Sequence, residues 1–124
     1  MSTLNVSNIS DGTTTVGTGY VVNGSAKAWC NWTNTGSIND SLNMSSVTDN
    51  GAGDFTVNYS SSMSSTSYAP VVTGEATYSG SAVFASYGDT AKTVSSMPVY
   101  SYTSVGGGNT DCPEYGISIH GDLA

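Results

Sequence analysis

Three separate segments of this chain alternate apolar and polar residues with a period of two, and this alternation constrains the fold more than any other feature. The segments are residues 25–33, 54–60 and 114–121. The side chains on their apolar faces are Ala26, Ala28, Cys30 and Trp32, then Phe55, Val57 and Tyr59, then Tyr115, Ile117 and Ile119. Successive side chains of a β-strand point to opposite faces, so each segment predicts a strand with one buried face.

The rest of the chain also favours strands. No window of a dozen residues has apolar side chains at helical spacing, and the abundant Ser, Thr, Gly and Asn residues are poor helix formers. Further strands are predicted at residues 42–48, 68–78, 81–86 and 93–102. The turn at residues 49–53 contains two glycines and predicts a hairpin between the strands beside it. Pro70 and Pro98 predict edge positions or bulges within their strands.

Short strands spaced at roughly 8–12 residues are typical of β-sandwiches. We therefore predict an all-β fold, an antiparallel β-sandwich with Greek-key or jelly-roll-like connections, over residues 18–124. Leu, Ile, Val and Phe together number only 21 of 124 residues, which is below the level of about 20% that marks a self-sufficient core. Part of the apolar burial is therefore expected to come from neighbouring subunits.

Residues 1–17 have a different pattern from the predicted sandwich. Leu4, Val6 and Ile9 are followed by Asp11-Gly12 and a run of threonines, so this part offers little to fill a core. We predict an extended N-terminal arm in which Leu4, Val6 and Ile9 dock on another subunit.

The charge of the chain excludes several classes of partner. Two lysines, Lys27 and Lys92, face nine carboxylates, for a formal net charge of −7. Without a basic patch, binding to nucleic acid or to anionic lipid is not expected. No apolar run approaches the roughly 20 residues that span a bilayer, so membrane insertion is not expected either. Residues 1–10 lack the features of a signal peptide, and we expect a short, complete gene product that is not exported by the standard route.

The supply of catalytic and metal-binding groups is small. His120, the single histidine, could be combined with Asp111 or Asp122 and any of 22 serines, but no Gly-x-Ser-x-Gly sequence marks a nucleophile. Asp49 and Asp54 flank a turn and are expected to shape it, and a calcium ion at Asp111 and Glu114 is only a weak alternative. We predict no enzymatic activity, no catalytic residue, no metal site and no cofactor.

Cys30 and Cys112 have no nearby Cys or His to complete a zinc site. We expect two reduced, buried thiols, with a disulfide as the alternative if the protein matures outside a cell.

Tyrosines gather in the C-terminal half of the chain. Their flat rings stand beside small polar residues, which suits the faces of sugars as well as subunit interfaces. The candidate receptor or interface contacts are Tyr78, Tyr87, Tyr100 and Tyr102. Tyr100 and Tyr102 are expected to share the strand face opposite to Val99.

Two runs of sequence resemble known proteins, residues 20–29 (YVVNGSAKAW) and residues 40–59 (DSLNMSSVTDNGAGDFTVNY). They are similar to a module of tail-fibre-like and other virion structural proteins of marine tailed bacteriophages, including cyanophages and pelagiphages. The likeness covers the whole chain and is strongest over residues 24–60. In such proteins the module often ends a longer chain, whereas here little precedes it, and residues 73–112 look individual.

This resemblance implies a virion structural protein, assembled in the cytoplasm of the bacterial host, homotrimeric, and in contact with other tail or capsid proteins. We expect a tail-fibre or spike-type appendage that attaches to the host surface through a cell-surface glycan. The alternative is a capsid decoration (cement) protein that stabilises the head.

Overall fold

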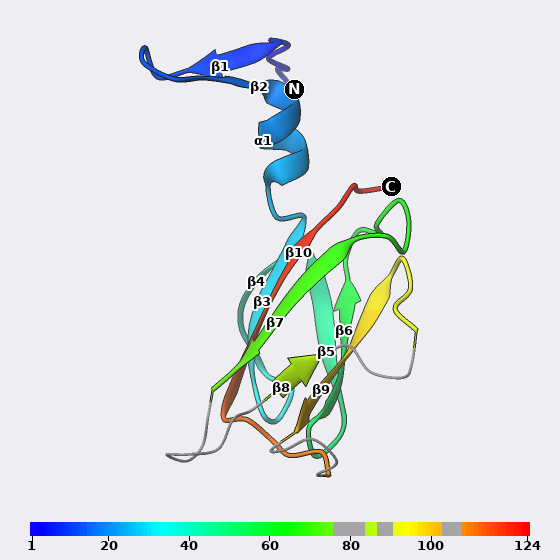
Figure 1. Ribbon diagram of the computed structural model, residues 1–124. Helices are drawn as coiled ribbons and strands as arrows, with labels where there is room; N and C mark the ends of the chain where they lie inside the picture. Colours follow the sequence, from blue (N-terminus) through cyan, green and yellow to red (C-terminus); the bar gives the residue numbers. More distant parts are fainter. Residues whose placement is uncertain (76–83, 87–90, 103–107) are drawn as a thin grey trace.

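The computed structural model of the chain describes residues 1–75, 84–86, 91–102 and 108–124 (Figure 1). Two antiparallel four-stranded sheets face each other, and an N-terminal hairpin and helix leave the sandwich at one end. The predicted all-β sandwich is confirmed.

The first sheet has the strand order β4-β3-β10-β7 and the second has the order β5-β6-β9-β8. In the first sheet the strands are β4 (Ile38–Leu42), β3 (Ala28–Thr33), β10 (Glu114–His120) and β7 (Ala69–Gly74). In the second they are β5 (Met44–Gly51), β6 (Asp54–Tyr59), β9 (Ser96–Tyr102) and β8 (Phe84–Ser86). Because β3 pairs with β10, and β6 with β9, strands distant in sequence lie side by side.

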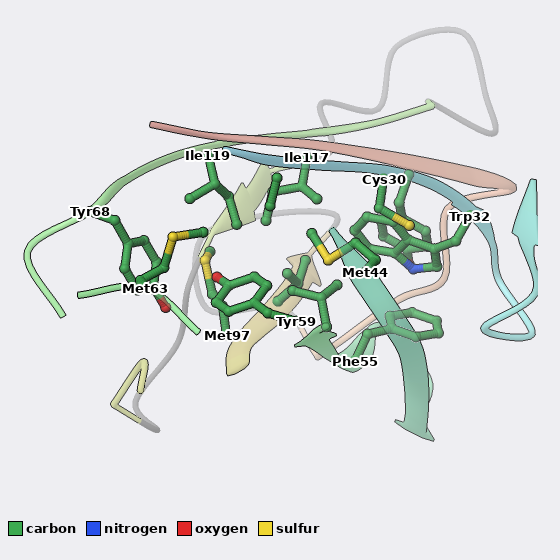
Figure 2. Close-up of a cluster of buried hydrophobic side chains, with 14 of the residues drawn as sticks. Cys30, Trp32, Met44, Phe55, Tyr59, Met63, Tyr68, Met97, Ile117 and Ile119 are labelled. Atoms are coloured by element: carbon green, nitrogen blue, oxygen red, sulfur yellow. The ribbon is translucent and has the colours of Figure 1, made fainter. Parts of the chain in front are cut away.

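The three alternating segments form β3, β6 and β10, and their apolar faces meet between the sheets (Figure 2). Trp32 of β3 stacks on Tyr115 of β10, with ring centroids 5.2 Å apart and planes within 9°. Phe55 of β6 packs against both rings, at 6.2 Å from Trp32 and 4.9 Å from Tyr115. Aromatic rings thus supply much of the bulk that the scarce Leu and Ile residues do not.

The predicted strand at residues 42–48 is wrong in one respect, because the structure divides it at Asn43. Leu42 ends β4 in the first sheet and Met44 begins β5 in the second. Asn43 takes φ +56°, and its side chain accepts a hydrogen bond from Ser61 N (2.7 Å) and donates to Lys27 O (3.2 Å) and Ser61 O (3.0 Å). Asparagine tolerates this left-handed conformation better than most residues, so the chain can turn from one sheet to the other here.

The two prolines lie where a missing N–H does little harm. Pro70 is on β7, an edge strand of the first sheet, as predicted. Pro98 is on β9, an inner strand, but β8 pairs only with Tyr100, Ser101 and Tyr102. Pro98 therefore lies beyond the end of that pairing.

The N-terminal region differs from the predicted extended arm. Residues 8–17 form an antiparallel hairpin of β1 (Asn8–Ser10) and β2 (Thr15–Gly17), and the helix α1 (Thr18–Gly24) follows at once. No helix was predicted, because seven residues are too few to display a periodic apolar stripe. The sandwich strands begin at Ala28, so α1 separates them from the hairpin.

Candidate functional site

We name residues 1–24 the N-terminal segment. Local hydrogen bonds close the turn of its hairpin. The Asp11 carboxylate accepts from the backbone N–H groups of Thr14 (2.8 Å) and Thr13 (2.9 Å), and Gly12 takes φ +95°. These bonds, the one from Thr14 first, hold the pKa of Asp11 below its ordinary value of 3.8. The turn thus forms from its own sequence, without support from the sandwich.

Thr18 connects the hairpin to the helix. Its backbone N–H donates to Ser7 O (2.9 Å), and its hydroxyl donates to Val6 O (2.9 Å). The chain just before β1 is therefore held against the first turn of α1, and Val6 and Ile9 are no longer parts of a free arm.

The N-terminal segment exposes all of its large apolar side chains. They are Met1, Leu4, Val6, Ile9, Val16, Tyr20, Val21 and Val22. Ile9 and Val16 are direct partners in the hairpin, so their side chains share one face. No residue of α1 is buried, and Tyr20 is 80% exposed. A concentration of exposed apolar side chains of this kind is typical of an interaction surface.

The helix α1 also has an open hollow along it. A depression of about 550 Å³ is lined by Gly17, Gly19, Tyr20, Asn23 and Gly24. A Cβ atom added at Gly19 or Gly24 would meet nothing within 4 Å. Glycine costs a helix about 1 kcal/mol relative to alanine, and no packing contact in the described part of the chain requires it at these two positions.

Lys27 holds the junction between α1 and the sandwich. Its ammonium group donates to Val22 O, to Ser25 O (3.0 Å) and to Ser25 Oγ (2.9 Å). A cation at the C-terminal end of a helix interacts favourably with the carbonyl groups exposed there. Lys27 is therefore engaged at the junction rather than available to a distant ligand.

At the opposite end of the sandwich lies the predicted hairpin turn between β5 and β6 (Figure 1). Asp49 accepts a hydrogen bond from Gly51 N (2.9 Å), so it shapes the turn as predicted. The Asn50 amide donates to Asp54 Oδ1 (3.2 Å) and to Thr56 Oγ1 (3.0 Å). The polar side chains of the turn are thus tied to the outer surface of β6.

Tyr100 and Tyr102 lie beside this turn, because Asp54 pairs directly with Tyr100 across β6 and β9. Both side chains are half-buried, and they face away from the buried Val99, as predicted. Their rings are stacked, with centroids 6.4 Å apart and planes within 11°. We name the outer surface of β6 and β9 beside this turn the distal face; it is formed by Asp54, Thr56, Tyr100 and Tyr102, whereas Pro98, further along β9, is buried.

Hydrogen bonds beneath the distal face fix its backbone. Ser101, between the two tyrosines, is fully buried, and its hydroxyl lies 2.8 Å from the Tyr115 hydroxyl. The Tyr115 hydroxyl also accepts from Cys112 N (2.8 Å). Gly53 O accepts from Ser101 N (3.0 Å), and Gly53 N donates to Asp111 Oδ1 (2.6 Å). The tyrosine pair therefore stands on a backbone that several elements hold in place.

In the described residues, the structure adds no support for a catalytic site at His120 or for a calcium site at Asp111 and Glu114. Asp111 bonds to Gly53 N, whereas Glu114 accepts from Asn31 Nδ2 (2.8 Å). Within residues 1–75, 84–86, 91–102 and 108–124, no group of three or more His, Cys, Asp or Glu residues could hold a metal ion. His120 is half-buried at the end of β10 and pairs with Ala69. Cys30 and Cys112 are buried and free.

The structure describes only some of the candidate receptor and docking residues that the sequence indicated. Tyr78 and Tyr87 lie outside the described residues, while Leu4, Val6 and Ile9 are exposed as a docking surface requires. Sequence reasoning missed Tyr20, Val21 and Val22, which it assigned to the sandwich. The sequence feature that could have shown that they form an exposed surface is a short apolar run between two glycines. This run lies in residues 1–24, where Asp11 is the one charged side chain.

Comparisons with known proteins add no relative: no family model, no curated protein and no solved structure matches this chain. The described part of the chain contains no helix long and apolar enough to cross a membrane. By its fold the protein is a β-sandwich. Residues 1–24, the N-terminal segment, lie outside the sandwich and expose apolar side chains.

Proposed function

We propose that this protein is a non-enzymatic structural component of a bacteriophage virion, a tail-fibre or spike-type appendage. It joins the particle through the N-terminal segment and contacts a host-surface glycan through the distal face. The observation that carries this proposal is the separation of the two surfaces, one at each end of the sandwich (Figure 1). The resemblance of residues 24–60 to virion proteins supports the setting.

The N-terminal segment is suited to hold neighbouring copies of the same chain. A helix of seven residues with no buried side chain is marginal by itself, so contacts outside the chain would stabilise it. Asp11 is its only charged side chain, in a chain of net charge −7. Acidic copies therefore repel one another least where these segments meet, and we propose a homotrimer assembled there, next to other virion proteins.

The distal face is suited to an uncharged sugar. The stacked rings of Tyr100 and Tyr102 offer apolar surface to the C–H faces of a pyranose, and the Asp54 carboxylate accepts hydrogen bonds from hydroxyl groups. Both cationic side chains of the protein lie elsewhere: Lys27 bonds to α1, and Lys92 donates to Tyr68 O (2.6 Å). Nothing cationic is left for an anionic sugar, which the net charge repels.

Assembly is tested by replacing Val22, which is 61% exposed, with serine in the full-length chain. The matched control is Val71→Ser, because Val71 is 60% exposed on β7. Analytical ultracentrifugation should give a trimer for the wild type and for Val71→Ser, and a monomer or a weakened trimer for Val22→Ser. Equal masses for the two variants would contradict assembly through the N-terminal segment.

Attachment is tested by binding to immobilised oligosaccharides, one neutral and one carrying uronic acids on the same backbone. The neutral form should bind the wild type more tightly, and Tyr102→Ala should weaken that binding by about 1–3 kcal/mol, the loss found when an aromatic ring that stacks on a nucleobase is removed. Val71→Ser, which lies on the other sheet and is expected to keep the trimer, is the control. Preference for the uronic acid form would refute the neutral-sugar assignment.

The position of the protein in the particle decides between the two virion roles. Cryo-electron microscopy of intact particles should show a few trimers on the tail, with the N-terminal segment toward the particle. Many copies spread over the head would instead identify a capsid decoration protein, and the proposal of host attachment would be wrong.

A further inference from the structure

We propose that Asn23 is a site of spontaneous deamidation, whereas Asn50, in the same Asn-Gly sequence, is protected by its hydrogen bonds. The chain therefore contains two identical reactive dipeptides in opposite structural contexts. The comparison is made for the monomeric chain and does not depend on the proposed function; only its consequence for assembly does.

The reaction needs water and no other reactant. The backbone nitrogen of the following glycine loses its proton and attacks the side-chain Cγ of asparagine, forming a C–N bond. The Cγ–Nδ2 bond breaks, ammonia leaves, and a five-membered succinimide remains. Water then opens this ring at either carbonyl, giving aspartate or isoaspartate. Glycine permits the attack best, because it lacks a Cβ and its backbone is the most flexible.

Asn50 is held away from this reaction at both reacting groups. Its side-chain amide donates to Asp54 Oδ1 (3.2 Å) and Thr56 Oγ1 (3.0 Å), which fixes its orientation. The attacking nitrogen, Gly51 N, donates to Asp49 Oδ1 (2.9 Å). Both groups lie at the end of a paired hairpin, so freeing them requires opening part of the sheet.

Asn23 is exposed on the last turn of α1, and the described part of the chain provides no hydrogen bond to its side chain. The helical backbone does not allow the attack, so the reaction requires this turn to open. Opening costs little in a seven-residue helix with no buried residue and no side-chain N-cap, although Lys27 bonds to Val22 O nearby. The free energy needed to open the backbone, which must precede the attack, is therefore much lower at Asn23 than at Asn50.

The consequence for assembly rests on the proposed function. Deamidation at Asn23 places a second carboxylate in a segment whose only charged side chain is Asp11. It does so beside the depression along α1, which Asn23 lines. Copies that meet there would then carry like charges at short distance, so aged protein is expected to assemble less well.

The experiment is peptide mass spectrometry of the full-length protein, incubated at neutral pH and at a concentration where it is monomeric, with isoaspartate and aspartate products resolved. Asn23 should react at least about tenfold faster than Asn50, which corresponds to ~1.4 kcal/mol in opening free energy. In concentrated urea the two rates should converge, because the difference is structural. Equal rates in the folded protein, or a faster Asn50, would overturn the proposal.

Two variants sharpen this test. In Gly24→Ala the added Cβ meets nothing within 4 Å, so the fold is kept while the attack is hindered, and the Asn23 rate should fall to that of Asn50. In Thr56→Val one acceptor of Asn50 is lost, and the Asn50 rate should rise. Asn23→Asp imitates the product and should weaken assembly. A full-strength Asn23→Asp trimer would overturn the consequence for assembly while leaving the measured deamidation rates unaffected.

Discussion

At the scale of single residues, Gly53 has the least room for a Cβ atom among the glycines that the structure describes. It takes φ +59°, and a Cβ atom there would lie 2.6 Å from Thr110 N and 2.7 Å from Ser101 O. These are backbone atoms held by hydrogen bonds, so they cannot move aside cheaply. Gly53→Ala is expected to lower the free energy of unfolding by about 2–4 kcal/mol. Urea unfolding measures this loss, and Gly19→Ala, where space is open, should change the value by less than about 1 kcal/mol.

The buried thiols and phenols predict a loss of stability in alkali. Burial, with a smaller effect of Asp40, raises the pKa of Cys30 from its ordinary value of 9.0 to about 11. Burial also raises the pKa values of Cys112 and Tyr115. A raised pKa in the folded state means that folding favours the protonated form. The stabilisation is therefore complete below about pH 9 and lost as the pH rises toward 11.

This alkaline effect is checked by urea unfolding at a series of pH values. The free energy of unfolding should stay level through neutral pH and fall above pH 9. In Cys30→Ala the fall between pH 9 and 11 should be shallower. A wild-type value that rises in alkali would contradict the pKa directions.

At the scale of elements, Asn43 decides how β4 and β5 are divided between the sheets. Asn43→Gly keeps the φ +56° conformation available and loses the three side-chain hydrogen bonds. Asn43→Ala loses the bonds and also strains the backbone by roughly 1–2 kcal/mol. We expect both variants to be destabilised, with alanine worse than glycine, in thermal or urea unfolding. If the two are equally stable, the left-handed conformation is not what makes this corner.

The strands show which elements could be predicted from sequence. Where one face is buried and the other is polar, as in β3, β6 and β10, alternation gave both the strand and its inward side chains. It failed at residues 42–48, which were predicted as one strand. The apolar pattern continues across Asn43 without a break, so it does not show that the chain passes from β4 to β5 there. It also failed at α1, because none of its seven residues is buried and no apolar face is imposed on them.

At the scale of the whole molecule, the sandwich and the N-terminal segment are expected to be independent. Every residue of the buried core lies between Ala28 and Ile119, so the N-terminal segment contributes none of it. A chain lacking residues 1–24 should therefore unfold cooperatively at nearly the wild-type temperature, as measured by calorimetry. The same truncated chain should be monomeric at concentrations where the full chain is assembled. A large fall in the unfolding temperature would show that the segment supports the sandwich.

The sequence by itself determined the all-β class, the inward faces of the main strands, the turn at residues 49–53 and the shared face of Tyr100 and Tyr102. These follow from local physics, because side-chain alternation and turn chemistry act between near neighbours in the chain. Only the tertiary structure decided that Asp54 lies beside Tyr100, that Asn43 joins the two sheets, and that Tyr20 to Val22 leave the sandwich. The first two depend on which distant strands pair, and pairing is decided by the whole core rather than by any one segment. Tyr20 to Val22 lie in α1, a helix with no buried residue.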